Sequence, residues 1–323
     1  MTSSSSNHAV RSYLSVDYAG AESSALLMDL HVPADAPGEV PVVIWLHGGG
    51  WFTGDRTLAP DLAACAARTK MAFASIDYRL SGEAKFPAPL DDVITAIRHL
   101  RARGAQWGID GARIGVWGAS AGAHLAALAA LKASAPAPEA PSDAQVACVV
   151  ACYPPVDLEM IIAQRPAGRS WEQTPEGRLL GVDPETGPGQ LVAQQASPLG
   201  HVSAQAPAFL ICHGTADELV PPVHSQMLFE RLEAESVPAE LYLLQDYRHG
   251  FINPPGRLDV QLAAVMDDGR LEAEVRAPAL ARNTRQPGTR DTTFGFAEIE
   301  NFLSAHLQAA NPHRQTPRGH SES

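Results

Sequence analysis

The chain has little cysteine. Its 323 residues include four, at Cys65, Cys148, Cys152 and Cys212, and none of them form a C-x-x-C pair. All four lie in apolar stretches, which is typical of small buried side chains and not of disulfides or metal ligands. This pattern excludes a disulfide-stapled scaffold and fits a reducing compartment, so we expect a cytoplasmic protein.

Long apolar runs and basic clusters are also missing. No stretch approaches the roughly 20 apolar residues that a membrane helix needs, and residues 1–11 lack the apolar core of a signal peptide. The formal net charge is −12 and the pI is near 5.4. Because nucleic-acid binding requires clustered Lys and Arg, we expect neither a membrane nor a nucleic-acid partner.

Cofactor signatures are lacking too. The twelve histidines show no H-E-x-x-H or similar ligand spacing, so the sequence predicts no metal site. The run Gly48-Gly49-Gly50 lacks the continuation of a G-x-G-x-x-G dinucleotide site. We expect a protein without a cofactor.

What is present is the composition of a globular α/β protein. Apolar residues make up 45% of the chain and charged residues 19%, enough to bury a sizeable core. Short apolar runs alternate with longer helical patterns, which predicts a mostly parallel sheet flanked by helices. We expect eight strands, at Arg11–Asp17, Ala25–His31, Val40–Leu46, Met71–Asp77, Arg113–Trp117, Val146–Ala151, Ala208–His213 and Glu240–Leu244. Helices are expected at Leu58–Thr69, Leu90–Arg103, Ala121–Lys132, Val223–Glu235 and Phe294–Leu307.

The same patterns divide the chain. We expect a single domain over residues 13–310, between a flexible N-terminus (1–12) and a flexible tail (311–323). Two polar stretches, 157–205 and 253–290, do not fit the alternation and are interpreted as cap or loop insertions. The second follows a candidate base directly, so we hypothesise a lid or a subunit contact there.

One segment has the form of a nucleophile elbow. Gly118-Ala119-Ser120-Ala121-Gly122 follows an apolar strand and leads into an alanine- and leucine-rich helix. A tight, strained turn requires residues without bulk two positions before and after the serine, and both positions are glycine. The pattern predicts that Ser120 is a nucleophile.

A second glycine-rich turn, His47-Gly48-Gly49-Gly50-Trp51, follows another apolar strand. Backbone N–H groups there can turn toward a developing oxyanion, and the residue after the nucleophile offers another. We assign the oxyanion hole to Gly49, Gly50 and Ala121. His47 is expected to brace this loop through hydrogen bonds, with a catalytic role as the alternative.

A serine nucleophile needs a histidine base and a carboxylate that orients it, and in this fold both lie downstream. His249 follows the strand 240–244 and is the candidate base. Asp217 follows the strand 208–213 and is the preferred acid. Glu218 and Asp246 are alternatives.

Other polar and aromatic residues receive structural or binding roles. Trp51 is assigned to substrate binding, with Phe52 and Trp171 as further pocket candidates. Trp45 and Trp117 are expected in the core, and His124 is expected to be structural. Asp77 is expected to pair with Arg79 near the sheet, with binding of a charged substrate as the alternative.

These motifs, with Asp77-Tyr78-Arg79-Leu80 and Phe86-Pro87-Ala88-Pro89, resemble the hormone-sensitive-lipase-like and bacterial feruloyl-esterase-like branches of the α/β-hydrolase superfamily. The resemblance covers roughly residues 40–307. It implies an α/β-hydrolase fold and hydrolysis of carboxylic esters without a metal or organic cofactor. The absence of a long apolar surface segment favours small to medium esters, hydrolysed through an acyl-enzyme. Ala123 departs from the pattern, since relatives commonly carry a glycine there.

Three functional hypotheses follow. The leading one is a serine carboxylesterase whose partner is a small-molecule ester. The same triad could instead serve an amidase, formamidase or peptidase, and a hydrolase-fold binding protein without catalysis is the alternative outside enzymes. A homodimer is considered for the assembly, although one sequence does not determine it.

Overall fold

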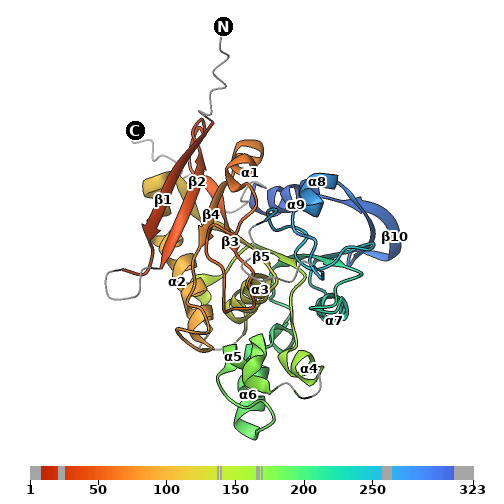
Figure 1. The fold of residues 1–323 in the computed structure, drawn as a ribbon. Helices are drawn as coiled ribbons and strands as arrows, with labels where there is room; N and C mark the ends of the chain where they lie inside the picture. The colour runs from red at the N-terminus through yellow and green to blue at the C-terminus, as the bar shows by residue number, and fades with distance from the viewer. Residues whose placement is uncertain are drawn as a thin grey trace, which may run out of the picture.

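The computed structural model describes residues 9–20, 26–136, 138, 140–164, 168, 170–256 and 264–308. A single sheet of ten strands runs through this part of the chain in the order β1-β2-β4-β3-β5-β6-β7-β8-β9-β10. Helices lie on both of its faces (Figure 1). The strands are β1 Val10–Asp17, β2 Leu27–Pro33, β3 Val40–Leu46, β4 Ala72–Ile76, β5 Ile109–Ala119, β6 Cys148–Cys152, β7 Ala208–Gly214, β8 Ala239–Leu244, β9 Ala277–Asn283 and β10 Gln286–Phe294.

The α-helices connect these strands and add a layer below the sheet. They are α1 Leu62–Thr69, α2 Ala88–Arg103, α3 Ala121–Ala133, α4 Leu158–Ala163, α5 Pro175–Leu180, α6 Gly187–Ala196, α7 Val223–Ala234, α8 Arg270–Glu274 and α9 Phe296–Leu307. Short 3₁₀ turns occur at η1 Gly104–Trp107, η2 Ser142–Ala144, η3 Trp171–Gln173 and η4 Pro198–His201. None of the helices in the described ranges is both long and apolar enough to cross a membrane.

The middle of the sheet is parallel. Strands β4, β3, β5, β6, β7 and β8 all run in the same direction, whereas β1, β2, β9 and β10 join antiparallel at the two sides. All six carboxyl ends of the parallel strands therefore meet at one edge, where α/β sheets place their sites. The predicted α/β class, the eight expected strands and the five expected helices are confirmed within a few residues.

Two predictions about segments are wrong. The sheet has ten strands and not eight, because residues 277–294, most of them expected in a loop insertion, form β9 and β10. Strand β10 is an exposed edge strand rich in polar residues, so it lacks the apolar alternation on which the prediction relied. The predicted flexible N-terminus, 1–12, overlaps strand β1, because Val10 already pairs with Pro33 in β1 and β2. The expected tail, 311–323, lies outside the described residues.

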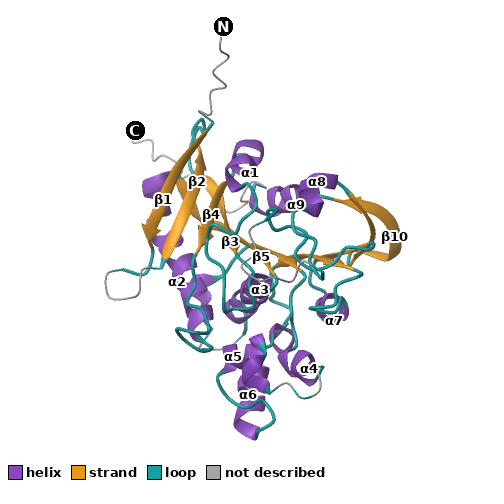
Figure 2. Cartoon of the chain, viewed as in Figure 1, coloured by secondary structure: helices purple, strands orange, loops and turns teal. Residues whose placement is uncertain are grey.

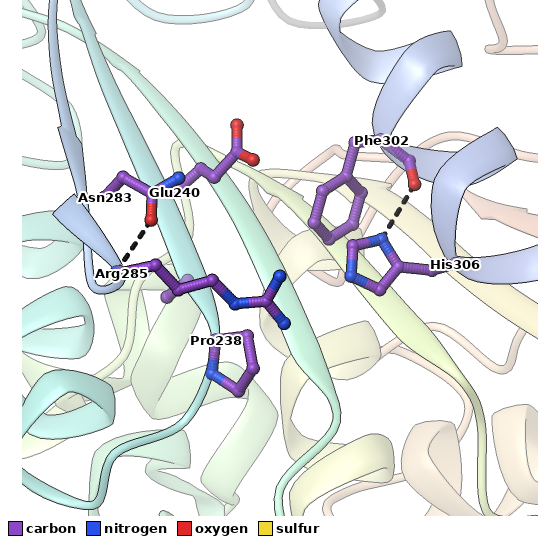
Figure 3. Close-up of a pocket in the computed structure, with 7 residues that line it drawn as sticks. Pro238, Glu240, Asn283, Arg285, Phe302 and His306 are labelled. Atoms are coloured by element: carbon purple, nitrogen blue, oxygen red, sulfur yellow. Dashed lines mark hydrogen bonds between the residues drawn. The ribbon is translucent and has the colours of Figure 1, made fainter.

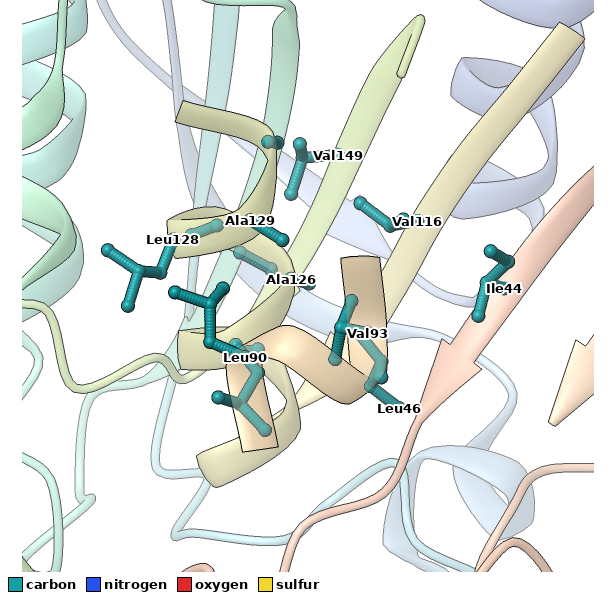
Figure 4. Close-up of a cluster of buried hydrophobic side chains, with 14 of the residues drawn as sticks. Ile44, Leu46, Leu90, Val93, Val116, Ala126, Leu128, Ala129 and Val149 are labelled. Carbon is teal, nitrogen blue, oxygen red and sulfur yellow. The ribbon is translucent and has the colours of Figure 1, made fainter. Parts of the chain in front are cut away.

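The core has two layers, one on each face of the sheet. Alternate residues of β3 divide between them, so Ile44 and Leu46 enter the first cluster while Trp45 enters the second. Figure 4 shows side chains of α2 and α3 facing the strands from the first side. In the second, Trp45 and Trp117 pack edge to face with ring centroids 4.8 Å apart, which confirms their predicted core positions. All four cysteines are buried and free, also as expected.

The segment 157–205 holds α4, α5 and α6. Figure 2 shows these helices gathered on one side of the molecule, next to α3. Apolar side chains from all three belong to the same buried cluster as α3, namely Leu158, Ile162, Leu179, Leu180, Ala193 and Ala196. The described helices of the segment therefore form a layer packed on the main core.

Candidate active site

Ser120 lies in a strained turn between β5, which ends at Ala119, and α3, which begins at Ala121. Its φ of 53° is in the left-handed region, which residues other than Gly, Asn and Asp seldom adopt. A Cβ on Gly122 would lie 2.1 Å from the carbonyl oxygen of Leu46, and one on Gly118 would lie 2.4 Å from the backbone of Gly122. Gly122 is therefore required for the close approach of the helix to β3, and Gly118 for the tight turn itself, as the sequence indicated.

The structure brings the three predicted triad residues together. The Nε2 atom of His249 lies 2.8 Å from Oγ of Ser120, and its Nδ1 atom lies 2.6 Å from Oδ2 of Asp217. Each residue follows the carboxyl end of a different parallel strand: Ser120 follows β5, Asp217 follows β7 and His249 follows β8. Nucleophile, base and orienting acid are thus arranged in the chain of hydrogen bonds that acyl transfer requires.

The carboxylate of Asp217 is buried and fully engaged. Its Oδ1 accepts the backbone N–H groups of Leu219 and Val220, both at 2.9 Å. Burial opposes its ionisation, but the charge of His249 and hydrogen bonds from His213 and His249 outweigh burial and hold the pKa of Asp217 well below its ordinary value. Asp217 is therefore ionised at neutral pH and can stabilise an imidazolium.

The alternative acids are not placed to replace it. Glu218 and Asp246 are both exposed, and the backbone N–H of Asp246 donates to Oγ1 of Thr215. The choice of Asp217 follows from the turn after β7, which points one of two adjacent carboxylates inward.

Two site residues were missed by the sequence interpretation. His213 is the penultimate residue of β7, and its Nε2 atom lies 3.3 Å from Oδ2 of Asp217. The same Nε2–H donates to the carbonyl oxygen of Val220 at 2.8 Å. Tyr153 follows β6, has a φ of 43° and packs its buried ring 4.6 Å from that of His249. Both lie at carboxyl ends of parallel strands, and that position was the signal that could have identified them.

The glycine-rich loop after β3 lies directly against the nucleophile. A Cβ on Gly48 would be 3.4 Å from Cβ of Ser120. Gly49 has φ +110° and Gly50 has φ +59°, conformations that glycine adopts without strain. The loop therefore presents backbone, and no side chains from Gly48 to Gly50, to the region around Ser120.

His47 braces this loop, as expected. Its Nδ1–H donates to the carbonyl oxygen of Gly48 at 2.7 Å, and its ring stacks on Tyr78 with centroids 4.3 Å apart. The hydroxyl of Tyr78 in turn donates to the carbonyl oxygen of His47. Because burial lowers the pKa of His47, the neutral ring is favoured, which suits a structural role.

The assignment of Trp51 to substrate binding is corrected by its position. Its side chain is 2% exposed and belongs to the main core cluster. The indole Nε1–H donates to Nδ1 of His124, whose Nε2–H donates to the carbonyl oxygen of Ala196. Burial lowers the pKa of His124 to about 4, so His124 is a neutral structural residue, as predicted. The hydrogen bond to His124 holds the indole of Trp51 in the core, away from the surface.

The other aromatic candidates differ in position. Phe52 is half-buried, and the guanidinium of Arg178, in α5, lies 5.3 Å from its ring centroid. Trp171 lies on η3 in the helical layer and is also half-buried. Phe52, which follows the glycine-rich loop, thus contacts helix α5 of segment 157–205.

The predicted ion pair between Asp77 and Arg79 does not form. Asp77 pairs with Arg56 at 2.7 Å, and Arg79 pairs with Asp92 at 2.6 Å. The two side chains lie two positions apart after β4 and pair with different partners, so this spacing does not bring them together.

Two shallow surface hollows lie at the opposite end of β8 and β9 from the triad. Figure 3 shows the first, with Glu240, Arg285 and His306 around it, and the second lies over the turn between β9 and β10. Neither includes a triad residue. Among the described residues, no group of His, Cys, Asp and Glu side chains is arranged to hold a metal ion.

Comparison with known families agrees with this geometry. The family model BD-FAE matches residues 28–232, well over half of the chain, and the match includes Ser120 and Asp217. The chain belongs to the BD-FAE family of α/β-hydrolases. The matched region ends before His249, so the candidate base lies in the part of the chain beyond the family match.

Individual relatives are also similar. The chain is 35% identical over 237 residues to Esterase LipC of Mycobacterium tuberculosis. The aligned region covers 70% of this chain and 57% of LipC. Overall, this BD-FAE protein spans about half the length of the curated relatives it matches.

Solved structures extend the likeness. A carbohydrate esterase from gut microbiota has a TM-score of 0.65 at 26% identity, with 75% of this chain and 90% of that one covered. Thermogutta terrifontis esterase 2 phosphonylated by sarin has a TM-score of 0.62 at 25% identity, with 78% and 90% covered. These structures share the α/β-hydrolase fold of this BD-FAE protein.

Proposed function

We propose that the protein is a serine carboxylesterase that hydrolyses small esters through an acyl-enzyme. The observation that carries the proposal is the continuous hydrogen-bonded chain Ser120–His249–Asp217. Ser120 lies in the strained turn between β5 and α3, next to the glycine-rich loop after β3. Each group has the contact that its role requires, and each step uses only groups of this chain, so we propose no cofactor.

In the acylation step, Oγ of Ser120 attacks the ester carbonyl carbon while Nε2 of His249 takes its proton. Asp217 stabilises the resulting imidazolium through Nδ1. Backbone N–H groups of Gly49, Gly50 and Ala121 stabilise the negative carbonyl oxygen. When the tetrahedral intermediate collapses, Nε2 returns the proton to the leaving alcohol.

In the deacylation step, His249 removes a proton from water as the water attacks the acyl carbon. Breakdown of the second tetrahedral intermediate releases the acid and returns the proton to Ser120. The sequence of steps is the reverse of acylation with water in place of the alcohol.

The relatives support small esters as substrates. LipC is named an esterase, and Thermogutta terrifontis esterase 2 has been solved with butyrate bound and with propionate bound. The helical layer 157–205 lies against the glycine-rich loop, since Pro175 lies next to Gly50 and Arg178 lies over Phe52. We propose that this layer caps the substrate pocket, in which case Phe52→Ala will change the preference for acyl-chain length.

The first test is hydrolysis of p-nitrophenyl esters from acetate to palmitate by the wild type and Ser120→Ala. We expect highest kcat/KM for short acyl chains and a loss of about 10⁴-fold or more in the variant, since the nucleophile is removed. Matched amides measured in parallel separate an esterase from an amidase. Equal activity of the wild type and S120A would contradict the mechanism.

Assembly and location are separate proposals. We propose a homodimer, for which the two edge strands of the sheet, β1 and β10, offer edges for pairing. Light scattering after gel filtration measures the mass.

We propose a cytoplasmic location, which the four free buried cysteines support. Fractionation of the native cells tests it.

A further inference from the structure

The loop that carries His249 is held from outside by another segment. Residues 264–274, which include α8, lie against residues 246–253 and make contacts on both sides of the base. We refer to residues 264–274 as the clasp. The sequence suggested a lid or a subunit contact in this region, but the contacts of the clasp are with the base loop itself.

Backbone hydrogen bonds form the first part of this attachment. His249 and Met266 form an isolated parallel bridge, and the N–H of Asp267 donates to the carbonyl oxygen of His249 at 2.8 Å. Further along, the N–H of Gly269 donates to the carbonyl oxygen of Asn253, also at 2.8 Å. The clasp therefore satisfies backbone groups at the base and four residues beyond it.

Side chains form the second part. The carboxylate Oδ2 of Asp267 accepts the backbone N–H of Arg248 at 2.8 Å and pairs with Nη1 of Arg270 at 2.9 Å. The same Nη1 donates to the carbonyl oxygen of Asp246 at 2.8 Å, and the guanidinium lies 3.9 Å from the ring centroid of Tyr247. Asp267 and Arg270 together thus contact three consecutive residues just before the base.

The base needs such support because Asp217 orients only its ring. The hydrogen bond at Nδ1 sets the rotation of the imidazole, whereas the distance from Nε2 to Ser120 also depends on where the loop places the His249 backbone. Catalytic groups must be held within a fraction of an ångström, and a displacement of about 1 Å can cost 10²-fold in rate. A loop without regular structure does not by itself provide that rigidity.

We infer that Asp267 and Arg270 are positioning residues for His249, an inference that rests on the proposed serine-esterase mechanism. They touch neither Ser120 nor the ring of His249. Their effect passes through the backbone of residues 246–249. Loss of either contact should lower the rate of proton transfer and leave substrate affinity unchanged.

The test compares Arg270→Ala with Arg282→Ala. The two arginines are closely matched: the Arg282 side chain is 30% exposed, pairs with Glu230 and Glu233 and lies 4.5 Å from the ring centroid of Phe229. Arg270 is 32% exposed and pairs with Asp267 and Glu274. Arg282 lies on β9 and both of its acidic partners lie on α7, so it serves as the control for loss of an arginine that bridges two acids over an aromatic ring.

We expect R270A to lower kcat roughly 10- to 100-fold at unchanged KM, and to slow the reaction of Ser120 with a fluorophosphonate by a similar factor. R282A should keep the wild-type kcat and labelling rate at a comparable thermal shift. Asp267→Asn, which keeps an acceptor for the N–H of Arg248, should retain more activity than Asp267→Ala.

Wild-type kcat in both R270A and D267A, measured below their melting temperatures, would overturn the inference. A raised KM at unchanged kcat would also overturn it, because it would place these residues in substrate binding. If R270A does not fold, the comparison of D267N with D267A decides. A wild type that neither hydrolyses esters nor reacts with the fluorophosphonate would instead overturn the proposed function.

Discussion

At the scale of the residue, Asp217 is the position where burial and charge compete most directly. Its side chain is fully buried yet ionised, because backbone N–H groups and two histidines surround it. Replacing it with Asn keeps the shape and removes the charge that stabilises the imidazolium of His249. We expect D217N to lower kcat about 10³- to 10⁴-fold, whereas Glu218→Gln, on an exposed neighbour, should leave the rate near that of the wild type. A large loss in E218Q would identify the other carboxylate as the partner.

The same carboxylate makes stability depend on pH. The pKa of Asp217 is lower in the folded protein than its ordinary value of 3.8, so the unfolded chain binds this proton more tightly. The stabilisation is complete well above pH 3.8 and is lost as the pH falls below that value toward the folded pKa. Urea unfolding of the wild type and D217N from pH 7 to pH 3 measures the effect. We expect the difference between their free energies of unfolding to shrink in the acid range, and a constant difference would contradict the lowered pKa.

At the scale of the element, the hairpin β9–β10 extends the sheet and does not act as a mobile cover. Phe294, at the end of β10, is fully buried, and its ring centroid lies 4.8 Å from that of Tyr242 in β8. Phe294→Ala should therefore lower the free energy of unfolding by about 3–5 kcal/mol. Asp291→Ala, at an exposed position of the same strand, should change it little. Similar urea midpoints for both variants would mean that the hairpin contributes little to the core.

At the scale of the whole molecule, the helical layer 157–205 and the sheet share one apolar cluster. Buried side chains of α4, α5 and α6 belong to the cluster that also contains α3 and the first face of the strands. Since these side chains cannot leave the cluster without exposing α3, we expect the layer to unfold together with the sheet. Hydrogen exchange followed through the thermal transition should show amides of α4–α6 and of β5–β7 losing protection at the same temperature. Earlier loss in α4–α6 would make the layer an independent lid.

The sequence by itself determined eight of the strands, β1 to β8, five of the helices, α1, α2, α3, α7 and α9, and the three residues of the triad. Apolar runs of β-forming residues mark buried parallel strands wherever they occur, and the elbow around Ser120 needs its two glycines for steric reasons that act within a few residues. Chain order then limited the base and the acid to residues downstream. These are local constraints, which is why a single sequence was enough.

Only the tertiary structure decided the remaining features. The choice between Asp217 and Glu218, the burial of Trp51 and the packing of Tyr153 on His249 depend on which side chains the folded sheet brings together from distant strands. The clasp shows this most clearly, since Asp267 and Arg270 follow the base by about twenty residues in a polar stretch without periodicity. Hydrogen bonds between segments leave no regular pattern in a sequence, because any polar residue with the right position can make them.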